Sequence, residues 1–211
     1  MSDLPHYQLF IDGAFCEGGT GQRMASQNPA TGQDWATFAC ASAADVDRAV
    51  AAAARALDDP IWRDMTQTAR GKLLYRLADL IEQNAQDLGA IETTDSGKLL
   101  AETSSQTAYV GDYYRYYAGL ADKIEGAVLP IDKPDMHVFT RREPIGVVVA
   151  IVPWNAQMFL TATKLGPALA AGCSVVLKAS EVAPAPMLEF ARLIEAAGFP
   201  PGVVSVITGD A

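Results

Sequence analysis

The chain has 211 residues, of which 50% are hydrophobic and 19% are charged, so its composition is that of a globular protein and not of a disordered or fibrous one. Its net charge of −9 argues against nucleic acid or an anionic membrane surface as a partner. The longest strongly apolar stretch, 145–154, is far shorter than the roughly 20 residues that span a bilayer. Three scattered cysteines, Cys16, Cys40 and Cys173, and the lack of a signal-peptide pattern predict a cytoplasmic protein without disulfides or a metal site.

Short strands and turns are expected over the first 40 residues. The segment 7–11 runs into Asp12-Gly13, a typical hairpin turn, and 14–16 returns. A second turn is expected at 28–32. Ser42 and Asp45 then have the spacing of a capping box, and the alanine-rich segment after them predicts a helix over 46–57.

Two further helices are indicated by stripes of similar side chains at helical spacing. One begins near Thr66 and places leucines and an isoleucine of 73–81 on a single face. Gly97 interrupts the helical pattern that follows. The next helix carries a stripe of tyrosines over 109–120, for which packing against other helices is the simpler interpretation and an aromatic binding surface is the alternative.

The second half of the chain predicts a hairpin and then alternating strands and helices. Segments 124–131 and 136–142 flank a turn at 132–135. The subsequent elements are a strand at 145–152, a helix at 159–171, a strand at 174–177, a helix at 185–197 and a strand at 203–207. This order predicts an α/β fold, with a parallel sheet that has helices on both faces. Strand 145–152 is apolar throughout, which is typical of a strand buried on both faces. Because the sequence stops soon after 203–207, we expect the sheet to be incomplete.

Polar residues follow two of the predicted parallel strands, at the carboxyl ends where ligand chemistry gathers. Asn155 comes after Pro153 and Trp154. Lys178 and Glu181 follow the next strand and could grip a ribose, because a carboxylate accepts from hydroxyl groups and an ammonium donates. Taken alone, the first segment is more often a turn and the second more often an exposed charged loop than a binding site. The chain has no Gly-x-Gly-x-x-Gly, P-loop or Gly-x-Ser-x-Gly motif.

Taken together, six segments in this order resemble the aldehyde dehydrogenase superfamily: 92–98, 142–148, 151–155, 164–172, 178–181 and 198–203. The resemblance implies NAD(P)-dependent oxidation of an aldehyde to a carboxylic acid, in a homo-oligomer that is a dimer or a tetramer. It also implies a Rossmann-like coenzyme-binding domain over 1–122 and 144–211, with 123–143 as a β-hairpin oligomerisation arm.

The resemblance assigns roles to individual residues. Asn155 matches the asparagine whose amide stabilises the oxyanion during catalysis. Glu181 is expected to face the adenosine ribose and to favour NAD, with NADP as the alternative. The residues implied in coenzyme binding are Ile151, Pro153, Trp154, Lys178, Ser180, Glu181 and Gly209.

Two departures from the family pattern affect these expectations. Ala179 stands where the family has the proline of Lys-Pro-Ser-Glu, which predicts a slightly looser turn. The family's nucleophilic cysteine, general-base glutamate and Gly-rich pyrophosphate turn have no match in the sequence, and none of its cysteines is assigned as nucleophile. We therefore expect part of an aldehyde dehydrogenase, without the catalytic domain and inactive alone. The alternatives are a shortened nucleotide-binding module and an assembly piece of the same fold.

Overall fold

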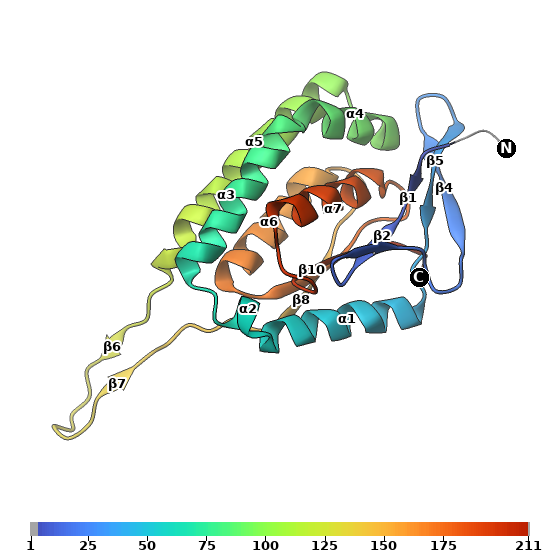
Figure 1. Ribbon diagram of the computed structural model, residues 1–211. Coiled ribbons are helices and arrows are strands. Elements are labelled where there is room, and N and C mark those ends of the chain that lie inside the picture. The colour runs from blue at the N-terminus through green and yellow to red at the C-terminus, as the bar shows by residue number, and fades with distance from the viewer. Residues whose placement is uncertain (1–3, 211) are drawn as a thin grey trace.

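The computed structural model describes residues 4–210 and has an α/β architecture, in which helices cover both faces of a five-stranded sheet (Figure 1). The helices are α1 (Ala43–Asp58), α2 (Pro60–Arg63), α3 (Gln67–Gln83), α4 (Ala85–Ser96), α5 (Leu100–Leu120), α6 (Gln157–Ala171) and α7 (Ala185–Ala197), with a 3-10 turn at Ala121–Lys123. The strands are β1 (His6–Tyr7), β2 (Leu9–Ile11), β3 (Ala14–Cys16), β4 (Arg23–Asn28), β5 (Gln33–Ala39), β6 (Val128–Leu129), β7 (Val138–Phe139), β8 (Val147–Ile151), β9 (Ser174–Lys178) and β10 (Val204–Ile207).

The central sheet is mixed, in the order β3-β2-β10-β9-β8. Strands β8, β9 and β10 are parallel as predicted, whereas β2 pairs antiparallel with β10 and β3 antiparallel with β2. The expectation of a purely parallel sheet is therefore wrong for this chain. The reason is that all three residues of β2 are buried, so the N-terminal hairpin extends the sheet beside β10. Strands β1, β5 and β4 form a separate small sheet.

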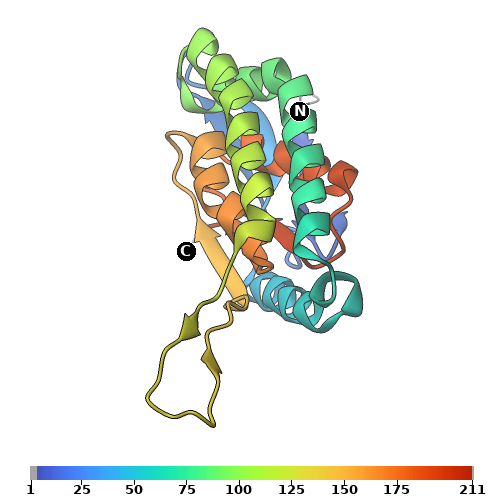
Figure 2. The ribbon, with the colours of Figure 1, turned by 90° about the vertical axis from the view of Figure 1, so that its left-hand side faces the viewer.

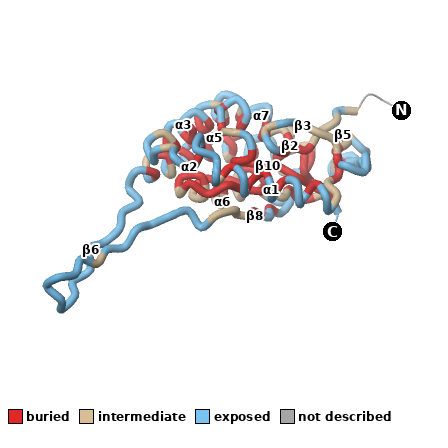
Figure 3. The backbone as a smooth tube through the Cα atoms, turned by 60° about the horizontal axis from the view of Figure 1, so that its bottom comes forward, coloured by how far each residue is buried: buried red, intermediate tan, exposed pale blue. Residues whose placement is uncertain are grey.

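Side chains alternate between two cores along β9. Val175 and Leu177 belong to the larger core, which α3, α5, α6 and α7 complete. Val176 lies on the opposite face with Ala49 and Ala53 of α1. Figure 3 shows the buried residues concentrated in the body of the molecule, whereas the projecting segment is exposed. The expectation of helices on both faces of the sheet is confirmed.

Several local predictions are confirmed. Ser42 and Asp45 form the capping box at the start of α1, and Thr66 caps α3. Gly97 and Gly198 end α4 and α7 with φ angles of 78° and 83°, a left-handed conformation that favours glycine. In each case the contact or backbone conformation at the helix end involves residues close together in the sequence.

Strand β8 corrects one prediction. It lies at the edge of the sheet, with Ala150 buried but Val149 and Ile151 58% and 68% exposed. A continuous apolar pattern shows that a strand tolerates burial on both faces, but it does not show which elements cover it. The prediction of burial on both faces is therefore wrong for the described residues.

The hairpin expected after α5 is present and projects away from the body (Figure 2). Its ladder joins only β6 to β7, and most of its residues are exposed, among them Val128, Met136 and Phe139. An isolated two-stranded ribbon is at best marginally stable in water. Contact with another surface would therefore stabilise this arm.

The tyrosine stripe of α5 divides between core and surface. Tyr113 and Tyr117 are partly buried and pack against the larger core, in agreement with the packing interpretation. Tyr109 and Tyr116 are 58% and 62% exposed, although Tyr109 also stacks on Phe159 of α6. Within residues 4–210, no helix is both long and apolar enough to cross a bilayer.

Candidate functional site

The three parallel strands end in register. Ile151 of β8 and Ile207 of β10 are both the register partners of Lys178, the last residue of β9. The loops that follow these strands consequently all leave the sheet at the carboxyl ends of the strands. They are 152–156, 179–184 and 208–210. All the residues that the sequence suggested for the site lie in these loops or at the strand ends that lead into them.

The loop between β8 and α6 presents its predicted site residues to solvent. Pro153, Trp154 and Asn155 are all exposed, and Trp154 retains 52% of its accessible surface. Within residues 4–210, the Asn155 amide has no hydrogen-bond partner. Its Nδ2 hydrogens are therefore available to a ligand. Helix α6 starts two residues later, at Gln157, and its N-cap residue provides no side-chain hydrogen bond.

Lys178 and Glu181 form an ion pair after β9. The Lys178 Nζ lies 2.7 Å from the Glu181 Oε2, and each side chain is about one third exposed. The hydrogen bond from Lys178 lowers the pKa of the Glu181 carboxyl, which is therefore ionised at neutral pH. The pair offers both a hydrogen-bond acceptor and a donor, and a hydroxyl group can pair with either.

Local structure explains why a serine stands at position 180 and a glycine at position 209. The buried Ser180 Oγ accepts a hydrogen bond from the Val182 backbone N–H at 3.2 Å and so shapes the loop that carries Glu181. A Cβ at Gly209 would lie 3.1 Å from the Ala41 carbonyl oxygen, closer than most side chains tolerate. Direct contact of these two residues with a coenzyme stays a prediction.

Ala179 makes a backbone hydrogen bond that counteracts the expected loosening of its turn. Its backbone N–H donates to the Ile207 carbonyl at 2.8 Å, which continues the β9–β10 ladder beyond β9. A proline at this position has no N–H to donate. The alanine therefore adds a hydrogen bond that the family's proline could not form.

We expect Ala179→Pro to lower the free energy of unfolding by about 1 kcal/mol, the usual net contribution of one hydrogen bond. Denaturant unfolding measures this change, and slow hydrogen exchange of the Ala179 amide in the parent protein reports the bond itself. Proline also reduces the entropy of the unfolded chain. A more stable variant would show that this entropic effect outweighs the hydrogen bond.

Sequence reasoning missed two buried carboxylates on α4. Glu92 and Asp95 are 1% and 3% exposed, and burial raises the pKa of both. Asp95 accepts hydrogen bonds from the Trp35 Nε1 at 2.9 Å and from the Ala185 backbone N–H, at the start of α7, at 2.8 Å. The sequence offered one signal: the two carboxylates are three residues apart, and so on one side of a helix, shortly before the glycine that ends it. Their burial could not be predicted, because their partners lie in distant segments.

The cysteines are free thiols in environments that do not favour a nucleophile. Burial raises the pKa of Cys16 and Cys40, whereas a reactive cysteine needs a lowered pKa. Cys173 is buried and directly precedes β9, at the opposite end of that strand from Lys178. No group of three His, Cys, Asp or Glu side chains in the described part of the chain could hold a metal ion.

The family is established by the match of the "Aldehyde dehydrogenase family" sequence model to residues 15–211. The chain belongs to the aldehyde dehydrogenase family. It is 61% identical over 206 residues to the (Z)-2-((N-methylformamido)methylene)-5-hydroxybutyrolactone dehydrogenase of Acinetobacter baylyi, a match that covers 98% of this chain and 42% of that protein. The chain therefore spans about two fifths of the length of this relative.

Solved aldehyde dehydrogenases share this fold. The NAD+ complex of the Bacillus cereus aldehyde dehydrogenase superposes with a TM-score of 0.95 at 39% identity, over 97% of this chain and 42% of that one. A betaine aldehyde dehydrogenase mutant from Staphylococcus aureus, also in complex with NAD+, gives a TM-score of 0.94 at 34% identity, over 97% of this chain and 41% of that one. Structural relatives of this aldehyde dehydrogenase family member therefore bind NAD+.

Proposed function

We propose that this chain forms the coenzyme-binding part of an NAD-dependent aldehyde dehydrogenase, which oxidises an aldehyde to a carboxylic acid. One observation carries the proposal: Asn155 and the Lys178–Glu181 pair follow neighbouring parallel strands whose ends are in register at Ile151 and Lys178. This arrangement brings a free amide donor and a ribose-binding ion pair to one edge of a sheet.

Each predicted residue has a defined task in this proposal. The Glu181 carboxylate accepts hydrogen bonds from the adenosine ribose, and the Lys178 ammonium donates to it. Trp154 and Ile151, together with Pro153, offer exposed apolar surface as one wall of the coenzyme cleft. Bound NAD supplies a hydride acceptor. Asn155 donates a hydrogen bond from Nδ2 to the substrate oxygen as negative charge develops there.

The proposal also includes the division of the chain. Residues 1–122 and 144–211 form the coenzyme-binding unit, and the projecting segment 123–143 is an oligomerisation arm. Exposed apolar side chains along the arm support this role, because contact with a second copy would remove them from water. The cytoplasmic location is part of the proposal too, and it is supported by the free state of all three cysteines.

The test compares the complete polypeptide that carries this chain with the 211-residue chain alone. We expect the complete protein to produce NADH and carboxylic acid in equal amounts from an aldehyde. A 5-hydroxylactone belongs among the substrates tried, because its ring-opened form carries an aldehyde and the 61% identical relative is named for such a compound. We expect no oxidation by the chain alone, because none of the cysteines within 4–210 matches the family's nucleophile.

Other outcomes separate the alternatives. A complete protein that binds NAD but oxidises no aldehyde would support a nucleotide-binding module without chemistry. One that binds no coenzyme yet assembles through the arm would support an assembly role. NADH production by the purified 211-residue chain would contradict our placement of the nucleophile outside it.

A further inference from the structure

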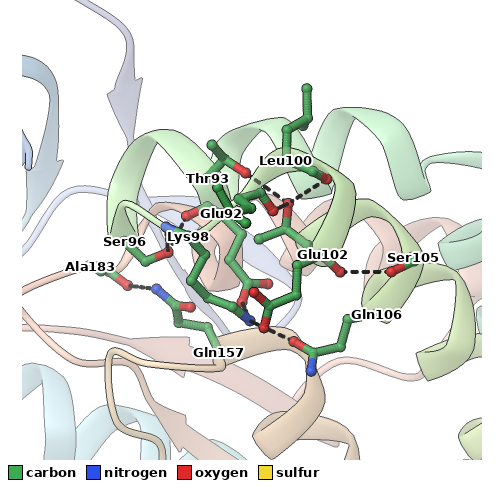
Figure 4. A network of polar contacts seen from close by, with 12 residues as sticks. Glu92, Thr93, Ser96, Lys98, Leu100, Glu102, Ser105, Gln106, Gln157 and Ala183 are labelled. Atoms are coloured by element: carbon green, nitrogen blue, oxygen red, sulfur yellow. Dashed lines mark hydrogen bonds and ion pairs between the residues drawn. The ribbon is translucent and has the colours of Figure 1, made fainter. Parts of the chain in front are cut away.

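The end of α4 carries a polar network that the proposed function leaves unused (Figure 4). It contains Glu92 and Lys98, two residues of the segment 92–98, and it extends to Glu102 and Gln106 on α5. Such a network is costly to bury unless its groups satisfy one another. Its position next to the start of α6 suggests what it does.

Glu92 faces the first turn of α6. Its carboxylate accepts a hydrogen bond from the Met158 backbone N–H. The first N–H groups of a helix have no partners within the helix, and the end that carries them favours negative charge. Ala156, the N-cap residue, has no side-chain group to supply either. The carboxylate from α4 therefore takes the place of an N-cap side chain for α6.

Lys98 lies beside this carboxylate and favours its ionised form. The Lys98 Nζ lies 3.4 Å from the Glu92 Oε1, 2.6 Å from the Gln106 Oε1 and 3.7 Å from the Glu102 Oε1. The left-handed turn at Gly97 brings the chain back so that the lysine can reach this site. Burial raises the pKa of Glu92, and both Lys98 and the Met158 N–H oppose that rise.

The same turn of α6 is tied to the second site loop. Gln157 is fully buried, and its Nε2 donates to the Ala183 carbonyl at 3.2 Å. Ala183 lies two residues after Glu181. The start of α6 is thus fixed from two sides, by the Glu92 carboxylate and by the loop after β9.

We propose that Glu92 is a positioning residue for Asn155, acting through the first turn of α6. The inference rests on the proposed function, in which Asn155 is the oxyanion donor. Asn155 stands three residues before Met158, and none of the residues 4–210 holds its amide. The direction of its side chain is consequently set by where α6 begins and how its first turn is oriented, and Glu92 supplies the charged contact to that turn.

The test uses the complete enzyme and the isosteric replacement Glu92→Gln. We expect kcat to fall about 10-fold to 100-fold, because a shift of a catalytic group by about 1 Å can lower the rate by up to about 100-fold. The Kd for NAD, measured by fluorescence titration, should stay the same. The decisive readout is a double-mutant cycle with Asn155→Ala. If Glu92 acts through Asn155, E92Q should lower kcat no further once Asn155 is alanine.

Asp45→Asn is the matched control, because Asp45 is also a buried carboxylate at a helix N-terminus, but it caps α1, which packs on the other face of the sheet. We expect it to lower the Tm while kcat is unchanged. If E92Q does not fold, Glu92→Asp provides the same cycle, because it keeps the charge and shortens the reach.

The possible results are distinct. Independent effects of E92Q and N155A on kcat, or an equal loss of kcat in D45N, would overturn the inference and leave Glu92 a purely structural residue. An unaltered kcat in E92Q would overturn it as well. A parent enzyme without aldehyde oxidation, or an N155A variant with full activity, would instead contradict the proposed function.

Discussion

Replacing Asn155 by alanine in the complete enzyme should lower kcat by about 10²–10³, the usual effect of removing one oxyanion donor. The structure supports a loss confined to catalysis. Asn155 is exposed, and within residues 4–210 its amide holds no other part of the protein. Removal of the amide should therefore change neither the folding of the loop nor the Kd for NAD. Steady-state kinetics with a saturating coenzyme and a separate binding titration measure the two quantities.

Asn28→Ala is a suitable control. The Asn28 Oδ1 accepts a hydrogen bond from the Ala30 backbone N–H at 2.9 Å, in the turn between β4 and β5. We expect this variant to lose stability without a loss of kcat. If Asn155→Ala weakened NAD binding as strongly as it lowered kcat, Asn155 would be part of the coenzyme site or of the loop's structure, and its role as an oxyanion donor would be wrong.

Elements whose signals are local could be predicted from the sequence. The capping box of Ser42 and Asp45, the Thr66 cap and the left-handed glycines each depend on contacts within a few residues. The β–α–β order of the second half likewise placed Asn155 and Lys178 at strand ends. That order alone was enough to predict that the candidate residues lie together at the carboxyl ends of neighbouring strands.

Features that depend on distant segments could not be predicted. The pairing of β2 with β10 requires Phe10 to meet Val206, and nothing near either residue specifies the other. The exposure of Ile151 depends on which elements cover β8. The link between Glu92 and the start of α6 joins two helices with a long intervening segment. In each case the residue types permit the contact, but only the packing of the whole chain decides whether it forms.

The choice of coenzyme should depend on the charge balance between Lys178 and Glu181. NADP differs from NAD by a 2′-phosphate, which carries about −1.5 to −2 at neutral pH. A lone carboxylate would strongly repel it. In this structure, however, the Lys178 Nζ lies 2.7 Å from the Glu181 Oε2, so the ammonium offsets part of that repulsion. We still expect a preference for NAD. The ionised Glu181 carboxylate accepts a hydrogen bond from the 2′-hydroxyl, and its ion pair with Lys178 leaves the ammonium less able to attract a phosphate.

Glu181→Gln should raise the ratio of kcat/KM for NADP to kcat/KM for NAD by about 10-fold, which corresponds to about 1.4 kcal/mol. The amide keeps the shape of the side chain but removes its negative charge and frees the Lys178 ammonium to meet the phosphate. Because both side chains are partly exposed, salt should reduce the effect. The measurement is steady-state kinetics of the complete enzyme with each coenzyme, at low and at high ionic strength.

Two further variants decide whether this explanation is correct. Glu189→Gln removes a carboxylate from a similar pair, with Arg192 on α7, and should leave the coenzyme ratio unchanged. The double variant Glu181→Gln with Lys178→Gln should lose the gain for NADP, because no ammonium remains for the phosphate. If the parent enzyme already used both coenzymes equally, or if Glu181→Gln left the ratio unaltered, Glu181 would not be the discriminating residue. If the double variant kept the gain, repulsion by the carboxylate alone would explain the preference, and Lys178 would serve the ribose in both coenzymes.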